Sequence, residues 1–127
     1  MNRVIIGIGS NINPQKNIET AQKMIAEKQL LLAQSQFVET EPIGYLKQLN
    51  FFNGVIFIET RYEREELKKQ LKELEVKLGR IRTENKYGPR TIDLDIVVWN
   101  GEIVDADVYE RDYLRNAVLE VWPGLKF

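Results

Sequence analysis

Two aspartates separated by a single residue, Asp93 and Asp95, lie within the apolar run IDLDIVV at positions 92–98. In an extended strand alternate side chains point to the same side, so the two carboxylates share one face and stand about 7 Å apart. Two ionised carboxylates on an apolar strand repel each other and resist desolvation unless cations lie beside them. Mg²⁺ suits this arrangement, because it binds one or two carboxylates and completes its coordination with waters and substrate phosphates.

A cluster of positive charge precedes the aspartates. Arg80, Arg82, Lys86 and Arg90 place four cations within eleven residues, and a Gly-Pro turn directs the last of them. The guanidinium group of arginine fits phosphate oxygens. Phosphoryl transfer requires carboxylates that bind a metal beside cationic side chains that bind phosphate, and this segment contains both. The short D-x-D pattern alone leaves an alternative open, in which the aspartates only form salt bridges with these arginines.

The composition excludes several other chemistries. The chain has no cysteine and no histidine, which removes disulfides, thiolate and imidazole metal sites and Ser-His-Asp triads. With 127 residues, 43% of them apolar, we expect one domain over residues 1–127. A net charge of −1 and the lack of a signal or membrane-spanning run predict a cytoplasmic protein that binds neither nucleic acid nor membrane. We expect a monomer, with a small oligomer as the alternative.

Strands predicted from β-branched and aromatic runs would carry these side chains. An Asn-Gly pair at 100–101 predicts a tight turn into a short hairpin after the aspartate strand. The glycines at 7 and 9 resemble part of a dinucleotide fingerprint, but its third glycine is missing, so we interpret them as a tight strand end beneath another segment. The predicted strands cover residues 3–10, 30–40, 51–60 and 92–99.

Two amphipathic helices separate these strands. Asn13 is predicted to cap the first, which begins at Pro14 and runs for about 14 residues. A leucine stripe predicts the second over residues 63–78, with Gly79 ending it, and a weaker helical pattern follows at 108–119. The order β-α-β-β-α-β predicts an α+β fold with a ferredoxin-like, mainly antiparallel sheet, both helices on one face, and a short C-terminal hairpin and helix.

Several of these segments resemble the 6-hydroxymethyl-7,8-dihydropterin pyrophosphokinases, folate-pathway enzymes that transfer diphosphate from ATP to the pterin and release AMP. The run YGPRTIDLDI at 87–96 is close to the family signature, an aromatic residue followed by GPRTLDLDI. The runs GSN at 9–11 and TEPIG at 40–44 are similar to the family's first strand end and its pterin loop. The resemblance covers nearly the whole chain and implies ATP and 6-hydroxymethyl-7,8-dihydropterin as substrates.

The resemblance also implies roles for individual residues. Asp93 and Asp95 resemble the ligands of two Mg²⁺ ions, and Arg80 and Arg90 resemble catalytic arginines that contact the triphosphate. Glu75 resembles a glutamate near the nucleotide, with a solvated helix charge as the alternative. Further ATP contacts are expected at Arg82, Tyr87 and Arg111. Pterin contacts are expected at Thr40, Pro42, Ile43, Phe51, Asn53 and Tyr113, where two rings stack on the pterin and the asparagine binds its amide edge.

One segment departs from the family pattern. The run VDADVYE at 104–110 stands where members carry a Pro-His segment that contacts the ATP phosphates, and its acidic side chains would oppose ATP if they lie near the phosphates. The two aromatic residues expected to stack on the pterin have a second interpretation as core residues. The resemblance implies a short, Mg²⁺-dependent pyrophosphokinase. The alternatives are a non-catalytic pterin- or nucleotide-binding paralogue and a ferredoxin-like regulatory or RNA-binding module.

Overall fold

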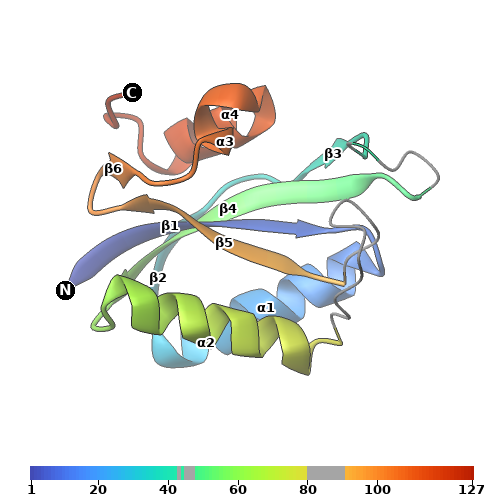
Figure 1. Cartoon of the computed structure of the whole chain (residues 1–127), viewed down its shortest axis with the longest axis horizontal. Helices are drawn as coiled ribbons and strands as arrows, with labels where there is room; N and C mark the ends of the chain where they lie inside the picture. Colours follow the sequence, from blue (N-terminus) through green and yellow to red (C-terminus); the bar gives the residue numbers. More distant parts are fainter. Residues whose placement is uncertain (43, 45–47, 80–90) are drawn as a thin grey trace.

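The computed structural model describes residues 1–42, 44, 48–79 and 91–127 (Figure 1). Within this part of the chain the strands are β1 (Asn2–Ser10), β2 (Leu30–Gln34), β3 (Val38–Thr40), β4 (Phe51–Thr60), β5 (Asp93–Trp99) and β6 (Glu102–Ile103). The helices are α1 (Pro14–Lys28), α2 (Arg64–Lys77), α3 (Asp107–Glu110) and α4 (Asp112–Val121).

The strands form one antiparallel sheet in the order β2-β4-β1-β5-β6, and β3 adds to the same strand β4. β1 lies at the centre, and each of the two β-α-β units leaves room for a strand of the other between its own strands. Figure 1 shows α1 and α2 together on one face of the sheet and α3 and α4 on the other. The predicted α+β, ferredoxin-like fold is therefore confirmed.

Each face of the sheet has its own apolar core. Val4, Ile6 and Ile8 of β1 pack toward α1 and α2, where Leu67 and Leu71 of the predicted leucine stripe are buried. The next residue positions of the strands point to the opposite face, which α4 covers. There the rings of Phe57 and Trp122 stack with their centroids 5.1 Å apart. The alternation along β1 thus assigns one face to the two long helices and the other to the C-terminal helices.

Two predicted element ends are confirmed by the backbone. Gly79 follows α2 with φ of +90°, and its N–H donates to the carbonyl of Val76, so it ends the helix as expected. Asn100 and Gly101 both have positive φ, 50° and 84°, as the predicted tight hairpin turn requires.

Three predictions about local structure need correction. Asn13 is the N-cap residue of α1, with Pro14 first in the helix as predicted, but it is in a left-handed conformation, φ 42°, and its side chain makes no cap hydrogen bond. The single strand predicted at 30–40 is two strands, because the Ser35 hydroxyl accepts the Val55 N–H at 2.8 Å and the chain leaves the ladder there. The weak helix predicted at 108–119 is broken at Arg111, whose backbone is extended (φ −114°, ψ 109°), and forms α3 and α4.

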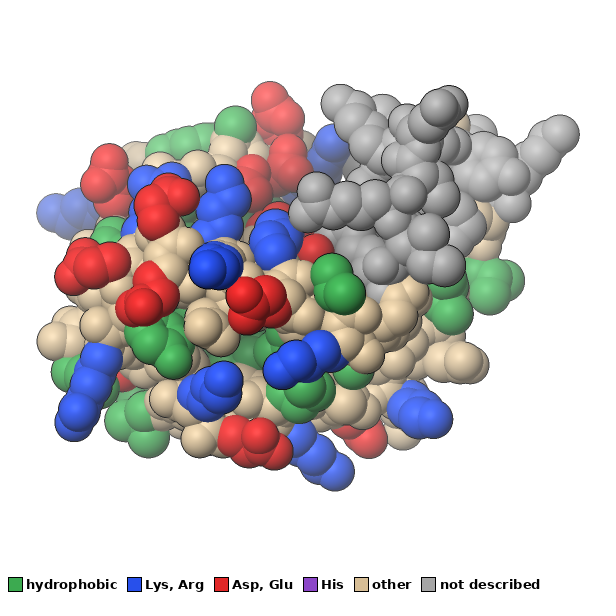
Figure 2. Space-filling model, turned by 60° about the horizontal axis from the view of Figure 1, so that its bottom comes forward, with side chains coloured by type: hydrophobic (Ala, Val, Ile, Leu, Met, Phe, Trp, Pro, Cys, Tyr) green, Lys and Arg blue, Asp and Glu red, His purple; other side chains and the backbone are tan. Residues whose placement is uncertain are grey.

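The outer surface of the α1–α2 side mixes both signs of charge. In Figure 2, Lys and Arg side chains alternate with Asp and Glu across the described residues of this side, so neither sign dominates it. None of the helices in the described ranges is long and apolar enough to cross a membrane.

Candidate active site

The predicted metal ligands lie on the sheet face that α1 and α2 do not cover. Asp93 pairs with Gly9 and Asp95 with Gly7 in the β1–β5 register, which confirms that both aspartates share one face of the strand. On the other side of β1, Asn53 of β4 pairs with the same Gly9. Because the glycines have no side chains, the three strands leave a hollow between the aspartates and Asn53.

This hollow is a cavity of about 80 Å³. It is too small to enclose a pterin ring together with a triphosphate. The predicted contacts Ile43, Arg80, Arg82, Tyr87 and Arg90 lie outside the described residues. Among the described ones, the side chains that line the cavity include Asn53, Asp93, Asp95, Asp105, Asp107 and Tyr113.

Asn53 is held in place from two sides. Its Nδ2 donates to the Thr40 Oγ1 at 2.6 Å, across the β3–β4 pairing. Its Oδ1 lies 2.7 Å from the point that a Cβ on Gly9 would occupy, so no other residue fits at position 9 without moving the amide. The interpretation of Gly9 as a close approach to another segment is confirmed, and that segment is the Asn53 side chain.

The other predicted pterin contacts are distributed around Asn53. Phe51 is half-buried and precedes Asn53 by two residues, so it shares the same face of β4, but it does not line the small cavity. Pro42 is buried, and Tyr113 reaches the cavity from the first turn of α4. Burial raises the pKa of the Tyr113 phenol, which keeps the hydroxyl protonated. Arg111, a predicted nucleotide contact, is the residue that separates α3 from α4.

The Asp95 carboxylate is the most perturbed acid of the site. Its pKa is raised to about 6, chiefly by burial and also by the neighbouring Asp93 carboxylate, against the opposing effect of the Lys72 ammonium. At Asp95 the Lys72 ammonium therefore does not fully offset burial and the charge of Asp93. A bound cation would therefore be stabilised at this position.

Acidic residues also approach from the C-terminal side. Asp105 and Asp107, from the segment that departs from the family pattern, line the same cavity as the aspartate pair. Burial raises the pKa of Asp105, and the nearby carboxylates of Asp107, Asp93 and Glu110 add to that effect. The expectation that this segment brings negative charge to the site follows from its sequence, and the structure places two of its carboxylates there.

Sequence reasoning missed Lys72, which joins α2 to the aspartate pair. Its Nζ lies 3.2 Å from the Asp95 Oδ1 and 3.1 Å from the Glu75 Oε2. Glu75 is only 1% exposed and also accepts the Leu94 N–H at 2.8 Å, so its alternative interpretation as a solvated helix charge is wrong. The sequence did contain a sign of this ion pair, since Lys72 and Glu75 are three residues apart on the predicted helix and adjacent to the apolar position Leu71.

The donors of this site fit magnesium better than a metal that needs a full protein cage. Within the described ranges, no group of three or more acidic side chains converges as a metal centre. Mg²⁺ commonly uses one or two carboxylates and takes its remaining ligands from water and phosphate. Asp93 and Asp95, with oxygen donors on one face and the raised pKa of Asp95, match that pattern.

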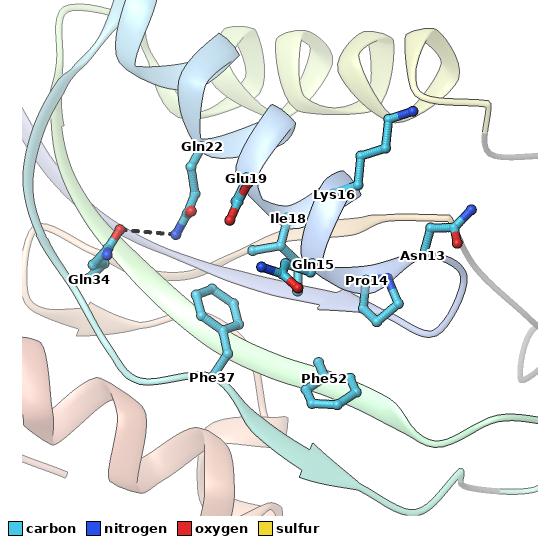
Figure 3. A pocket seen from close by; sticks show the side chains of 10 residues that line it. All are labelled: Asn13, Pro14, Gln15, Lys16, Ile18, Glu19, Gln22, Gln34, Phe37 and Phe52. Carbon is cyan, nitrogen blue, oxygen red and sulfur yellow. Dashed lines mark hydrogen bonds between the residues drawn. The ribbon is translucent and has the colours of Figure 1, made fainter.

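A second, larger groove lies on the other side of the sheet (Figure 3). It measures about 1020 Å³, and the rings of Phe37 and Phe52 face α1 across it. A hydrogen bond of 3.0 Å between the amides of Gln22 and Gln34 joins α1 to β2 at one end. None of the described residues predicted for metal, nucleotide or pterin lines this groove, whereas Asn53, Asp93, Asp95 and Tyr113 line the smaller cavity.

Comparison with known proteins agrees with this geometry. The family model described as 7,8-dihydro-6-hydroxymethylpterin-pyrophosphokinase matches residues 5–123. The chain is 30% identical to 2-amino-4-hydroxy-6-hydroxymethyldihydropteridine pyrophosphokinases of Haemophilus influenzae and Bacillus subtilis, over 91% and 94% of its length and 79% and 78% of theirs. It is 36% identical to the folic acid synthesis protein fol1 of Schizosaccharomyces pombe, of whose length it spans only 18%. The chain belongs to the 7,8-dihydro-6-hydroxymethylpterin-pyrophosphokinase family.

Proposed function

We propose that this chain transfers diphosphate from ATP to 6-hydroxymethyl-7,8-dihydropterin, producing the pterin diphosphate and AMP in folate biosynthesis. The observation that carries the proposal is the row Asn53–Gly9–Asp93 across three strands, which sets a hydrogen-bonding amide beside a pair of carboxylates. The family and the names of its members support the same activity. In this reaction the pterin hydroxymethyl oxygen bonds to the β-phosphorus, and the bond to the α-phosphate oxygen breaks to release AMP.

Asp93 and Asp95 are the residues that would hold magnesium. Bound there, two Mg²⁺ ions would neutralise the charge that develops on the transferred phosphates. The protein residues supply position: the two aspartates would hold the metal, and Glu75 supports their strand by accepting the N–H of Leu94, which lies between them. We assign Arg80, Arg82, Tyr87, Arg90 and Arg111 to the nucleotide from the family motif.

Asn53 is the residue that would orient the pterin. Its amide matches the donor and acceptor pattern of a pterin edge, and the Thr40 hydroxyl keeps it from rotating. Phe51 and Tyr113 would supply flat rings on which a pterin could stack, and we assign Pro42 and Ile43 to the pterin from the family motif. No histidine is needed for this transfer, since positioning and charge neutralisation account for most of the rate.

The test is AMP formation from ATP and Mg²⁺, with and without the pterin. We expect AMP that depends on the pterin, and we expect Asp95→Ala to abolish it. Glu27→Ala, which removes an exposed carboxylate from α1, is the matched control and should keep wild-type activity. Pterin-dependent AMP at an undiminished rate in Asp95→Ala would disprove the assignment of the aspartates.

A second candidate function is a pterin-binding protein with little or no catalysis. Asp105 and Asp107 favour it, because they add negative charge to the cavity where ATP phosphates would enter. Calorimetric titration separates the two candidates. Pterin binding without Mg²⁺-dependent ATP binding would support the binding protein, whereas ATP binding with micromolar affinity would support the enzyme.

A further inference from the structure

The Lys72 ammonium is anchored to the outer edge of β5. Its Nζ lies 3.0 Å from the Leu94 carbonyl oxygen, 3.1 Å from the Glu75 Oε2 and 3.2 Å from the Asp95 Oδ1. An ammonium group has three N–H donors, so these three contacts use all of them. Lys72 has therefore no donor to spare for another acceptor unless it gives up one of these contacts.

Two of the three contacts hold Lys72 independently of the aspartates. β6 pairs with β5 only at Val98 and Trp99, and at Leu94 the side chains of α2 take the place of a neighbouring strand. Glu75 accepts the Leu94 N–H while Lys72 donates to the Leu94 carbonyl, so both backbone groups of this residue are satisfied. Because the Glu75 carboxylate is buried, moving the ammonium away would break an ion pair of 3.1 Å with a buried charge, which is costly.

From this anchor Lys72 crosses the edge of the sheet. α2 packs on one face, with Leu67 and Leu71 in the core, whereas Asp95 lines the cavity on the other face. A lysine ammonium in contact with two carboxylates carries a positive charge at neutral pH. The site therefore has a fixed cation on one oxygen of a predicted metal ligand.

We propose that Lys72 is a built-in counter-cation of Asp95, which weakens divalent-metal binding to the nucleotide-free chain and couples metal binding to the arrival of polyphosphate. A divalent ion on the same carboxylate is repelled by the ammonium, and a like charge within a few ångströms lowers affinity on the order of tenfold even when water screens it. The negative charge of a polyphosphate offsets this repulsion. The inference rests on the proposed function for the identity of the metal ligands.

An opposite effect is predicted if Lys72 only orients the carboxylate. Outer contacts that position a metal ligand raise affinity, and their loss weakens binding by about 10- to 100-fold. The direction of the change in metal affinity therefore distinguishes a counter-cation from a positioning residue.

The experiment measures Mn²⁺ binding to the nucleotide-free protein at pH 8 from the electron paramagnetic resonance signal of free Mn²⁺. We expect Lys72→Met to bind Mn²⁺ about tenfold more tightly than wild type and to lose that binding when Asp95→Ala is added. Lys72→Arg keeps the charge, and Lys69→Met removes a positive charge from an exposed position of the same helix. Both controls should bind Mn²⁺ within about twofold of wild type.

A second variant guards against a folding failure. Lys72→Met removes the ion pair between Lys72 and the buried Glu75, so we add Lys72→Met/Glu75→Gln, in which the amide oxygen still accepts the Leu94 N–H. It should show the same tightening, with circular dichroism reporting that it is folded. Unchanged, undetectable or weaker Mn²⁺ binding in the folded Lys72 variants would overturn the proposal.

The AMP assay on the wild type tests the proposed function independently of the Mn²⁺ measurements on the Lys72 variants. Tighter, Asp95-dependent Mn²⁺ binding in Lys72→Met without any pterin-dependent AMP in the wild type would support the role of Lys72 and contradict the kinase. Pterin-dependent AMP in the wild type, together with unchanged Mn²⁺ affinity in Lys72→Met, would support the kinase and contradict the role of Lys72.

Discussion

One face of β1 is aliphatic through its middle, at Val4, Ile6 and Ile8, whereas the other changes from Ile5 to Gly7 and Gly9 as it approaches the aspartates. On the first face every large side chain packs against α1 and α2, and the core continues into β4 and β5. On the second face, packing against α4 stops where the glycines begin, and polar side chains line a cavity instead. The same strands therefore provide stability on one side and a binding site on the other.

This comparison predicts that neighbouring residues of β5 affect different properties. The largest effect is expected for Asp93→Ala, which should lower kcat/KM by about a thousandfold, because it removes one of the two carboxylates that would bind the metal. The free energy of unfolding should change little, because the side chain lies at the rim of the cavity. Steady-state kinetics and urea unfolding on the same preparation measure both. A loss of activity explained by unfolding would contradict the division between the faces.

Leu94→Ala should show the opposite profile. Its side chain is 0% exposed on the helix-covered face, so truncation should lower the free energy of unfolding by about 3 kcal/mol. Leu32→Ala, at a position that is 42% exposed on β2, is the matched control and should change it by less than about 0.5 kcal/mol. Equal losses in the two variants, measured by urea unfolding, would show that the helix face is not the main source of stability.

Gly9→Ala tests whether the site depends on a glycine at position 9, which leaves room for the Asn53 side chain. The added Cβ would lie 2.7 Å from the Asn53 Oδ1 and push the amide out of place, so the KM for the pterin should rise about tenfold with little change in the KM for ATP. Gly124→Ala adds the same atom where nothing lies within 4 Å, and should behave as wild type. An unchanged KM for the pterin in Gly9→Ala would separate Asn53 from pterin binding.

The smallest effect concerns pH. The pKa of Asp95 is raised from 3.8 to about 6, so the folded state holds this proton more tightly, and the stability it contributes at low pH is lost as pH rises through about 6. Asp95→Asn should therefore gain stability relative to wild type between pH 4 and pH 7.5. We expect a gain of about 1 kcal/mol, because Asp95 is 45% exposed and solvent screens part of its charge. Urea unfolding of both proteins at both pH values measures this gain. If the difference in free energy of unfolding between Asp95→Asn and wild type is the same at both pH values, the raised pKa of Asp95 is contradicted.

Much of the fold could be predicted because its signals are local. The leucine stripe of α2, the Asn100-Gly101 turn and the alternation that puts Asp93 and Asp95 on one face depend only on spacing along the chain. The break at Ser35 was not predictable in this way. It depends on a hydroxyl that bonds to the backbone of β4, twenty residues away in the sequence.

The sequence by itself determined the order of the elements, the shared face of the aspartates and the family to which they point, since each is contained in short motifs or in a period of two or 3.6 residues. The tertiary structure alone decided which groups surround those aspartates. Asn53 reaches them from β4, Asp105 from the loop between β6 and α3, and Lys72 from α2, and their contacts follow from strand register and helix packing, which no local pattern encodes. The charge balance of the site is therefore a property of the fold, although every charge in it is visible in the sequence.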